Sequence, residues 1–390
     1  MKRIPYSRQS INQSDIEAVT EVLRSDWLTQ GPTVRKFEDA IADYCRCDHA
    51  VAFSSASAAL HAGCHALELG KGDRFATSNI TFAASANCGL HCGAKLDLCD
   101  VDPQNGLIDL GKLEAICCQL GPPKLVIPVY LAGNSVDQVA LKKLSEKYSF
   151  SVLEDASHAL GARYQNTPIG SCSYSDVAVF SLHPVKMITS GEGGLLVTNN
   201  SNVATRARKF REHGISRESK EWQNNTETNG SWYYEVQELG FNYRLSDIHA
   251  ALGLSQLDRL DSFVSRRRAI HKHYSEHLAP ECWTVVSDAK DCTSSWHLCV
   301  AQLPEDSTSE CYHAVFKALR EKGLYVNLHY IPLNRHPLYE ALNQTDHYPG
   351  SDSWARRALS IPCHPELSDD DLGHTTRILN ETAQHFLQMR

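Results

Sequence analysis

The chain has 390 residues, of which 42% are hydrophobic and 22% are charged, and its formal net charge is −8 at pH 7. This composition is typical of a globular protein with one large and one smaller domain, and no stretch has the length of a transmembrane helix. The N-terminus lacks the apolar core of a signal peptide, and no dense Lys/Arg face appears. We therefore expect a soluble, cytoplasmic protein that binds neither membranes nor nucleic acids.

Fourteen cysteines are present, which is a high number for a chain of this length. No two of them form a C-x-x-C pair; the nearest spacings are Cys45-x-Cys47, Cys88-x-x-x-Cys92 and the adjacent Cys117-Cys118. A zinc site normally takes paired ligands at finger-like spacing, so no metal site is predicted. In the absence of a signal peptide we expect these side chains to be reduced structural thiols.

The first half of the chain alternates predicted strands with predicted helices. Helical periodicity covers residues 13–24, with Ser14 as N-cap and Glu17 three positions later, and again residues 34–45. Strands are predicted at residues 51–53, 75–80, 95–100, 125–130, 150–155, 177–182 and 195–198, with helices at 81–93, 137–148 and 204–212. This order predicts an α/β fold with a largely parallel sheet, whose ligands bind beyond the carboxyl ends of its strands.

A smaller unit is predicted to follow, so that residues 1–250 form the large domain and 251–390 a small C-terminal α/β domain. The polar stretch 216–231 is typical of a surface loop or hairpin, and Ser246 is the predicted N-cap of a long helix over residues 246–277. Strands at 298–303 and 325–329 and helices at 309–322 and 368–388 complete the second unit.

Residues 177–199 contain the most informative stretch of the chain. Two apolar strands enclose a polar loop that carries Lys186 and the glycine-rich turn 191–194. A lysine in such a place can lose its hydration, which lowers its pKa and frees its amine to attack a carbonyl. Because a solvated loop lysine is far more common, the interpretation depends on partners elsewhere in the chain.

Candidate partners lie at or just beyond the ends of other predicted strands. The serine-rich segment 54–59 precedes a helix, whose N-terminus attracts phosphate groups. Asp155 ends a strand and is suited to hold a pyridine nitrogen protonated, while Phe82 is suited to stack on an aromatic ring and His158 to bond a phenolic oxygen. Each residue also has an ordinary structural interpretation: a serine N-cap, a helix cap for Asp155, and core packing for Phe82 and His158.

Several motifs resemble the DegT/DnrJ/EryC1/StrS family of sugar aminotransferases. They are Glu154-Asp-Ala-Ser-His-Ala159, Phe180-Ser-Leu-His-Pro-Val-Lys186 and Gly191-Glu-Gly-Gly194, with collinear matches at 27–32, 54–59, 161–163, 240–244, 329–332 and 359–362. The resemblance spans nearly the whole chain. It implies a fold-type-I transferase that depends on pyridoxal 5′-phosphate, with a mostly parallel sheet flanked by helices and a smaller C-terminal α/β domain.

The same resemblance implies the roles of the residues around the cofactor ring. Lys186 corresponds to the catalytic lysine that binds the cofactor as an imine and later moves a proton to or from the substrate carbon. Asp155 corresponds to the partner of the pyridine nitrogen, Phe82 to the aromatic that stacks on the ring, and His158 to the residue that faces the cofactor.

The resemblance also implies how the cofactor phosphate is held. Ser57, Ala58 and Ser181 correspond to phosphate contacts within the chain. Asn242 corresponds to a phosphate ligand that the neighbouring subunit provides, so the family pattern implies a homodimer with shared active sites.

The substrate class follows from the segment that precedes Lys186. Ser-Leu-His-Pro-Val-Lys resembles the branch that transfers an amino group from L-glutamate to C4 of a UDP-linked 4-keto-6-deoxy-N-acetylhexosamine. The product of that branch, UDP-4-amino-4,6-dideoxy-N-acetyl-β-L-altrosamine, serves pseudaminic acid biosynthesis. His183 and Pro184 carry this resemblance, whereas Leu182 and Met187 stand where Phe and Pro fit the branch better.

Three alternatives remain open from the sequence. The chain could act on another nucleotide-linked keto sugar, or it could be a non-catalytic, cofactor-binding regulatory module. A related dehydratase is a third alternative, but such enzymes need a residue other than lysine at position 186. Arg244, Arg163 and His329 are candidate donors to the UDP, and the sequence does not choose among them.

Overall fold

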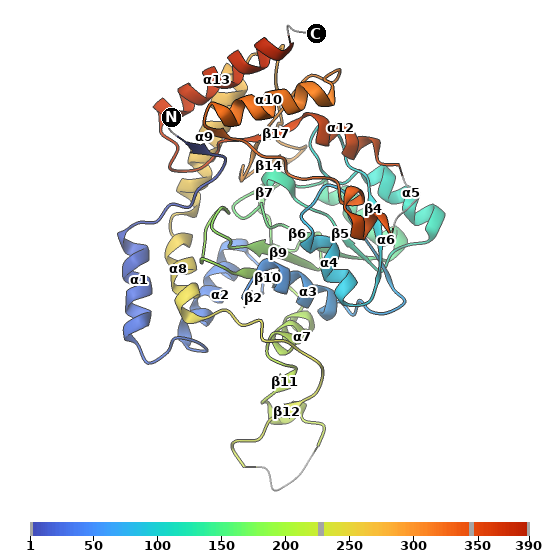
Figure 1. The fold of residues 1–390 in the computed structure, drawn as a ribbon. Coiled ribbons are helices and arrows are strands. Elements are labelled where there is room, and N and C mark those ends of the chain that lie inside the picture. Colours follow the sequence, from blue (N-terminus) through green and yellow to red (C-terminus); the bar gives the residue numbers. More distant parts are fainter. Residues whose placement is uncertain (1–2, 225–229, 343–346, 388–390) are drawn as a thin grey trace.

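The computed structural model describes residues 3–224, 230–342 and 347–387. Its centre is a seven-stranded sheet in the order β2-β10-β9-β6-β5-β3-β4 (Figure 1). These strands are β2 (His49–Phe53), β3 (Arg74–Ser78), β4 (Lys95–Cys99), β5 (Leu125–Ile127), β6 (Ser151–Asp155), β9 (Val177–Ser181) and β10 (Gly194–Thr198). Only β10 runs antiparallel to its neighbours. The predicted α/β class with a mostly parallel sheet is confirmed.

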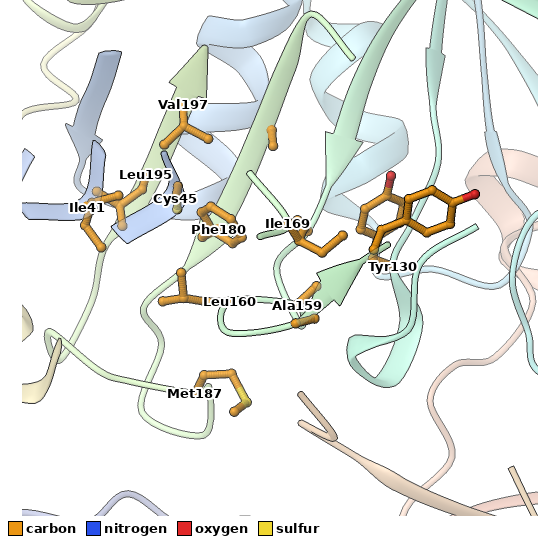
Figure 2. Close-up of a cluster of buried hydrophobic side chains, with 14 of the residues drawn as sticks. Ile41, Cys45, Tyr130, Ala159, Leu160, Ile169, Phe180, Met187, Leu195 and Val197 are labelled. Carbon is orange, nitrogen blue, oxygen red and sulfur yellow. The ribbon is translucent and has the colours of Figure 1, made fainter. Parts of the chain in front are cut away.

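Both faces of this sheet are buried, which explains why its strands are apolar almost without interruption. Along β9, Val177 and Val179 pack into one buried cluster, whereas Ala178 and Phe180 pack into another (Figure 2 shows the Phe180 side). The Phe180 face is covered mainly by α2 (Pro32–Cys45), α5 (Leu110–Leu120) and α6 (Gln138–Tyr148). The opposite face is covered by α3 (Ala56–Ala66), α4 (Ala84–His91) and α7 (Ser201–Arg211).

The C-terminal part forms a second, smaller layer of strands and helices. Helices α8 (Asp247–Leu257) and α9 (Leu260–His277) lead to an antiparallel sheet of β13 (Thr284–Val285), β15 (Cys299–Gln302) and β17 (Ala358–Ile361). Helices α10 (Ser309–Glu321) and α13 (Asp369–Leu387) pack on it, at the top of Figure 1. The N-terminal strand β1 (Ile4–Pro5) joins this region by pairing with β16 (Leu324–Tyr325). The predicted domain boundary at residue 250 falls inside α8 and stays a prediction.

Shorter elements complete the described chain. They are α1 (Gln13–Arg24), β7 (Arg163–Tyr164), β8 (Thr167–Pro168), β11 (Ile215–Ser216), β12 (Glu235–Val236), β14 (Cys292–Thr293), α11 (Pro337–Glu340), α12 (Pro349–Arg357) and 3-10 turns at Leu131–Gly133, Ser219–Glu221 and Leu333–Arg335. Strands β11 and β12 pair antiparallel at the base of the predicted polar loop, of which residues 225–229 lie outside the described range, as does residue 388 of the predicted last helix. No helix in the described ranges is long and apolar enough to cross a membrane.

Three local predictions were wrong. The N-cap of α1 is Asn12 rather than Ser14, because Asn12 and Asp15 bond each other's backbone N–H reciprocally. The long helix 246–277 is divided by a turn at Asp258 and Arg259, and the Arg259 guanidinium pairs with Asp15. Its predicted N-cap, Ser246, is confirmed.

The predicted strand 325–329 is the third error, because β16 ends at Tyr325. The segment beyond it changes partners: Asn327 forms an isolated bridge with Ser360, and the carbonyl of His329 accepts from Trp354 Nε1 at 3.0 Å. Residues 327–330 thereby leave the sheet and reach over the end of the large sheet.

Candidate active site

A cavity of about 450 Å³ lies at the carboxyl ends of β6 and β9 and the N-terminus of α3. This is the place where ligands bind in open parallel sheets. Residues 327–330 of the C-terminal part and Tyr6 of the N-terminal segment form the opposite wall. The cavity has the size of a cofactor or small-substrate site.

The loop between β9 and β10 positions Lys186 at the wall of this cavity. Its backbone N–H donates to His183 O at 2.9 Å, and the Ser7 hydroxyl donates to Val185 O at 2.9 Å. Thr189 Oγ1 closes the same loop by donating to Leu182 O at 2.9 Å. A fixed loop places the lysine amine at one position in the cavity instead of leaving it in solvent.

The environment of the Lys186 amine favours its neutral form. Burial lowers its pKa to about 8, and this effect outweighs the opposing attraction of the Asp155 carboxylate. With a pKa of about 8, roughly a tenth of the amine is unprotonated at pH 7, which is far more than for an unperturbed lysine. The activated lysine predicted from the sequence has a physical basis in this geometry.

Asp155 ends β6 and lines the same cavity, although only 5% of its surface is exposed. Its Oδ2 accepts from Ser85 Oγ at 2.5 Å, and its Oδ1 accepts from the backbone N–H of Ser157 at 3.1 Å. Both carboxylate oxygens thus have a donor and a fixed direction. A further cationic N–H donor in the cavity would meet a preoriented anion.

His158 has a defined tautomer. The backbone N–H of Ala132 donates to its Nδ1 at 3.3 Å, so the ring proton lies on Nε2, which donates to Tyr330 Oη at 3.1 Å. Burial holds the pKa of His158 well below its usual range, and the nearby Lys186 charge lowers it further. The Tyr330 hydroxyl, having accepted from His158, keeps its own proton available for donation into the cavity.

Two more neutral imidazoles surround the lysine. Burial lowers the pKa of His329 to about 3, and it lowers that of His297 well below the usual value, with the His158 and Lys186 charges acting in the same direction. His329 Nδ1 bonds Ser360 Oγ at 2.7 Å, whereas His297 Nδ1 has no hydrogen-bond partner among the described residues. These rings add polar atoms to the cavity without adding positive charge.

The N-terminus of α3 forms the anion-attracting side of the cavity. Ser55 is its N-cap, and its Oγ accepts from Ala58 N at 3.2 Å. The N–H groups of Ala56 and Ser57 precede the first helical acceptors and so have no intrahelical partner, and both residues line the cavity. Gly194 allows this close approach, since a Cβ there would lie 2.4 Å from the Ala56 nitrogen.

Most of the residues predicted from the sequence lie together around this cavity. The lining includes Ser57, Phe82, Asp155, His158, Ser181 and Lys186. Ala58 does not line it, and its N–H is bonded to the Ser55 cap. Asn242 is exposed and forms a β-bridge with Glu212 outside the cavity. Of the candidate UDP donors, His329 lines the cavity, whereas Arg163 and Arg244 do not.

Sequence reasoning missed Tyr6, Ser85, His297 and Tyr330. Ser85 lies four residues after Thr81, whose hydroxyl is 2.7 Å from its own, and no sequence pattern singled it out. The other three come from segments far away in the sequence, and their placement depends on how the C-terminal part packs over the sheet. No local pattern carries that information.

The comparisons with known proteins now decide the family. The model of the DegT/DnrJ/EryC1/StrS aminotransferase family matches residues 9–380. The chain belongs to this family. The aminotransferase is 36% identical over 371 residues, 94% of both chains, to a UDP-4-amino-4,6-dideoxy-N-acetyl-beta-L-altrosamine transaminase of Campylobacter jejuni. It is also 36% identical over 376 residues to the spore coat polysaccharide biosynthesis protein SpsC of Bacillus subtilis, covering 95% of this chain and 94% of that protein.

Solved structures agree with the family assignment. Helicobacter pylori PseC, an aminotransferase involved in the biosynthesis of pseudoaminic acid, has a TM-score of 0.91 at 30% identity, covering 98% of this chain and all of PseC. The PLP-form of a putative sugar aminotransferase from Streptococcus pneumoniae has a TM-score of 0.89 at 27% identity, covering 98% and 99% of the two chains. The aminotransferase is a pyridoxal phosphate-dependent enzyme of sugar metabolism that takes a keto sugar and an amino donor.

The residues around the cavity fit pyridoxal phosphate. Lys186 supplies an amine that can be neutral, Asp155 supplies a fixed carboxylate, and the α3 N-terminus supplies free N–H donors. Phe82 lines the cavity with 60% of its surface exposed, so its ring has room to stack on a cofactor ring.

Proposed function

We propose that the aminotransferase moves an amino group from L-glutamate to C4 of a UDP-linked 4-keto-6-deoxy-N-acetylhexosamine. The product is UDP-4-amino-4,6-dideoxy-N-acetyl-β-L-altrosamine, a precursor of pseudaminic acid. The names of the Campylobacter jejuni relative and of Helicobacter pylori PseC support this substrate class, as does the His183-Pro-Val185 segment before the lysine.

The observation that carries the proposal is the pairing of Lys186, with its lowered pKa, and Asp155 in one cavity over the α3 N-terminus. When bound, pyridoxal phosphate supplies an aldehyde that bonds covalently to an amine and a ring that withdraws electrons from the substrate carbon. Lys186 would hold this aldehyde, and its free amine is the group that would take and return the proton at the substrate carbon.

The other residues hold the ring. Asp155 would accept a hydrogen bond from the protonated ring nitrogen and so stabilise the positive charge there. Phe82 would stack on the ring, and His158, its proton held on Nε2, would face the cofactor. Tyr330 keeps this tautomer in place by accepting from Nε2.

The cofactor phosphate is held at the start of α3. Ser57 and Ser181, which line the cavity, are the proposed phosphate contacts within the chain, whereas the Ala58 N–H is held by the Ser55 cap. Asn242 of the partner subunit completes the phosphate site, so that the active enzyme is a homodimer with shared active sites. The exposed position of Asn242 agrees with a role outside its own cavity.

Defined substrates test the substrate proposal. The enzyme is incubated with UDP-4-keto-6-deoxy-N-acetylhexosamines of both C5 configurations and L-glutamate, and the products are analysed by NMR. We expect the L-sugar to be converted into the C4-amino product with the altro configuration. Turnover of neither UDP sugar, together with conversion of L-glutamate to 2-oxoglutarate when another keto sugar is the acceptor, would overturn the proposal.

A second candidate is a different nucleotide-linked keto sugar. The Bacillus subtilis relative, which functions in spore coat polysaccharide biosynthesis, is as similar to the chain as the Campylobacter jejuni enzyme. Leu182 and Met187 also differ from the residues expected in the altrosamine branch. Parallel incubations with dTDP-linked keto sugars distinguish the two candidates.

A further inference from the structure

Tyr330 belongs to the C-terminal part of the chain and lines the catalytic cavity. Its hydroxyl oxygen lies 3.1 Å from His158 Nε2, and among the described residues this hydroxyl makes no other hydrogen bond. The centroid of its ring lies 6.1 Å from that of Phe82, which lines the same cavity. The hydroxyl and the Phe82 ring are therefore placed to contact one and the same ligand.

A backbone donor sets the direction of the hydrogen bond between His158 and Tyr330. The N–H of Ala132 can only donate, and it lies 3.3 Å from His158 Nδ1, so Nδ1 is an acceptor and the ring proton is on Nε2. Nε2 then donates to the Tyr330 oxygen. Both ring nitrogens of His158 are thus in use, and the ring has no proton left for a ligand.

The position of His158 is fixed by its surroundings. Ser295 Oγ donates to its backbone carbonyl at 2.9 Å, and its buried ring lies 4.5 Å from the ring of His297, centroid to centroid. Turning the imidazole toward a ligand would leave the Ala132 N–H without its acceptor in a buried place, which is unfavourable. The Tyr330 hydroxyl is therefore the end of this chain of donors that reaches the cavity.

The segment around Tyr330 is held on both sides. The carbonyl of His329 accepts from Trp354 Nε1 at 3.0 Å. Further along, the N–H of Leu333 donates to the carbonyl of Asn79, just beyond β3, at 2.9 Å. The tyrosine is thereby anchored to the C-terminal part and to the large sheet, so its hydroxyl has a defined place in the cavity.

A donor of this kind favours an acceptor that carries negative charge. Burial raises the pKa of Tyr330 above its usual range, and the Asp155 charge acts in the same direction, so the hydroxyl keeps its proton. Charge-assisted hydrogen bonds are stronger than neutral ones, and the bond accepted from His158 polarises the hydroxyl further. In pyridoxal phosphate the phenolic oxygen is negative when the ring nitrogen is protonated, as it would be opposite Asp155.

We propose that the Tyr330 hydroxyl donates a hydrogen bond to the phenolic oxygen of the bound cofactor and that His158 is a positioning residue that acts through Tyr330. The proposal rests on the cofactor placement proposed above, with the ring between Lys186, Asp155 and Phe82. It gives the C-terminal part of the chain a direct contact with the cofactor ring.

A non-covalent probe tests this contact. Pyridoxamine 5′-phosphate has no aldehyde and so forms no bond to Lys186, and its 3-deoxy analogue lacks the phenolic oxygen. Calorimetric titration of the cofactor-free enzyme should show that pyridoxamine phosphate binds about 10-fold more tightly than the analogue, and Tyr330→Phe should lose most of this preference. Effects of the missing oxygen on the ring itself are the same in both enzymes. An equal preference in wild type and Tyr330→Phe would overturn the proposal.

The double variant tests whether His158 acts through Tyr330. In His158→Asn the amide oxygen replaces Nδ1 as acceptor for the Ala132 N–H. This substitution should reduce the preference for pyridoxamine phosphate when Tyr330 is present and should have no further effect in Tyr330→Phe. Additive losses would show that His158 contacts the ligand directly, which contradicts the proposed order.

Tyr312→Phe is the matched control for the loss of a buried tyrosine hydroxyl. Tyr312 Oη donates to Ala358 O at 3.0 Å outside the cavity, so removing it should leave the preference between the two compounds unchanged. A preference that falls as much in Tyr312→Phe as in Tyr330→Phe would trace the effect to general loosening of the C-terminal part and refute the contact.

Asp155→Asn separates this proposal from the cofactor placement on which it rests. Both compounds carry the ring nitrogen, so this variant should weaken the binding of both. If it weakens both while Tyr330→Phe leaves the preference unchanged, the placement stands and the Tyr330 contact alone is refuted. If it weakens neither, the placement itself is wrong. No sugar and no amino donor is present, so the substrate proposal is not affected by either result.

Discussion

Lys186 shares its cavity with three imidazoles that burial keeps neutral, so its own ionisation dominates the charge of the cofactor-free site. Its pKa is lowered from 10.5 to about 8. Below pH 8 the lysine is charged both folded and unfolded, and the fold bears the full penalty of burying that charge. Between pH 8 and 10.5 only the unfolded chain keeps the proton on Lys186. The contribution of this lysine to the free energy of unfolding therefore rises with pH over that range.

We therefore expect Lys186→Met to stabilise the cofactor-free enzyme relative to wild type at pH 7. The difference between the two free energies of unfolding should shrink by about 2 to 3 kcal/mol as the pH rises to 10. Urea unfolding at pH 7, 8, 9 and 10 measures it. The exposed Lys71→Met provides the matched control, for which the difference should stay constant. A Lys186→Met difference that is also independent of pH would show that the lysine is not desolvated.

The carboxylate of Asp155 gives a second prediction at this scale. Asp155→Asn should retain cofactor but lower kcat by about 10²-fold or more, because the amide carries no charge to hold the ring nitrogen protonated. Ser85→Ala removes one hydrogen bond to the same carboxylate and keeps its charge, so a loss of about 10-fold is expected. Cofactor content is read from absorbance after desalting. Equal losses in the two variants would argue against a role for the charge.

At the scale of elements, the contact between β10 and α3 sets the geometry of the cavity. In Gly194→Ala the added Cβ would lie 2.4 Å from backbone atoms of Ser55 and Ala56, which have no flexible side chain to yield. We expect a displaced α3 N-terminus, seen as at least a 10-fold weaker retention of pyridoxal phosphate on dialysis and as a lower Tm.

Gly373→Ala in α13 is the control for this substitution, because nothing lies within 4 Å of its added Cβ. Removing a helical glycine there should raise stability by about 0.5 to 1 kcal/mol and leave cofactor retention unchanged. If Gly194→Ala retained cofactor as well as Gly373→Ala does, the close approach would not matter for binding.

Element by element, the sequence predicted what local patterns determine. Apolar runs predicted the strands of the large sheet, and residues at their ends, such as Asp155 and Ser181, were predicted correctly to lie at one cavity. The cap at Asn12 was missed although it rests on a local capping box with Asp15, whereas the break after Leu257 depends on the long-range pairing of Arg259 with Asp15. Residues 327–330 were misassigned because their partners, Ser360 and Trp354, are not neighbours in sequence.

At the scale of the whole molecule, the proposed shared site makes a prediction about mixed dimers. Neither Lys186→Ala nor Asn242→Ala should turn over substrate at an appreciable rate alone. Refolding the two variants together at equal amounts should restore about a quarter of wild-type activity, because half of the dimers are mixed and each has one intact site of two. If Asn242 serves its own cavity, mixing restores nothing.

The pairing of β1 with β16 has a consequence for biosynthesis. Ile4 lies opposite Leu324, so the first strand cannot pair until 320 further residues have been synthesised. At roughly 5–20 residues per second on the ribosome, that delay is about 16–64 s. Tyr6 and Ser7 follow this strand and contact the cavity and the lysine loop. The catalytic cavity is thus among the last parts of the nascent chain to form. A fusion partner at the N-terminus is therefore expected to slow the appearance of activity more than one at the C-terminus.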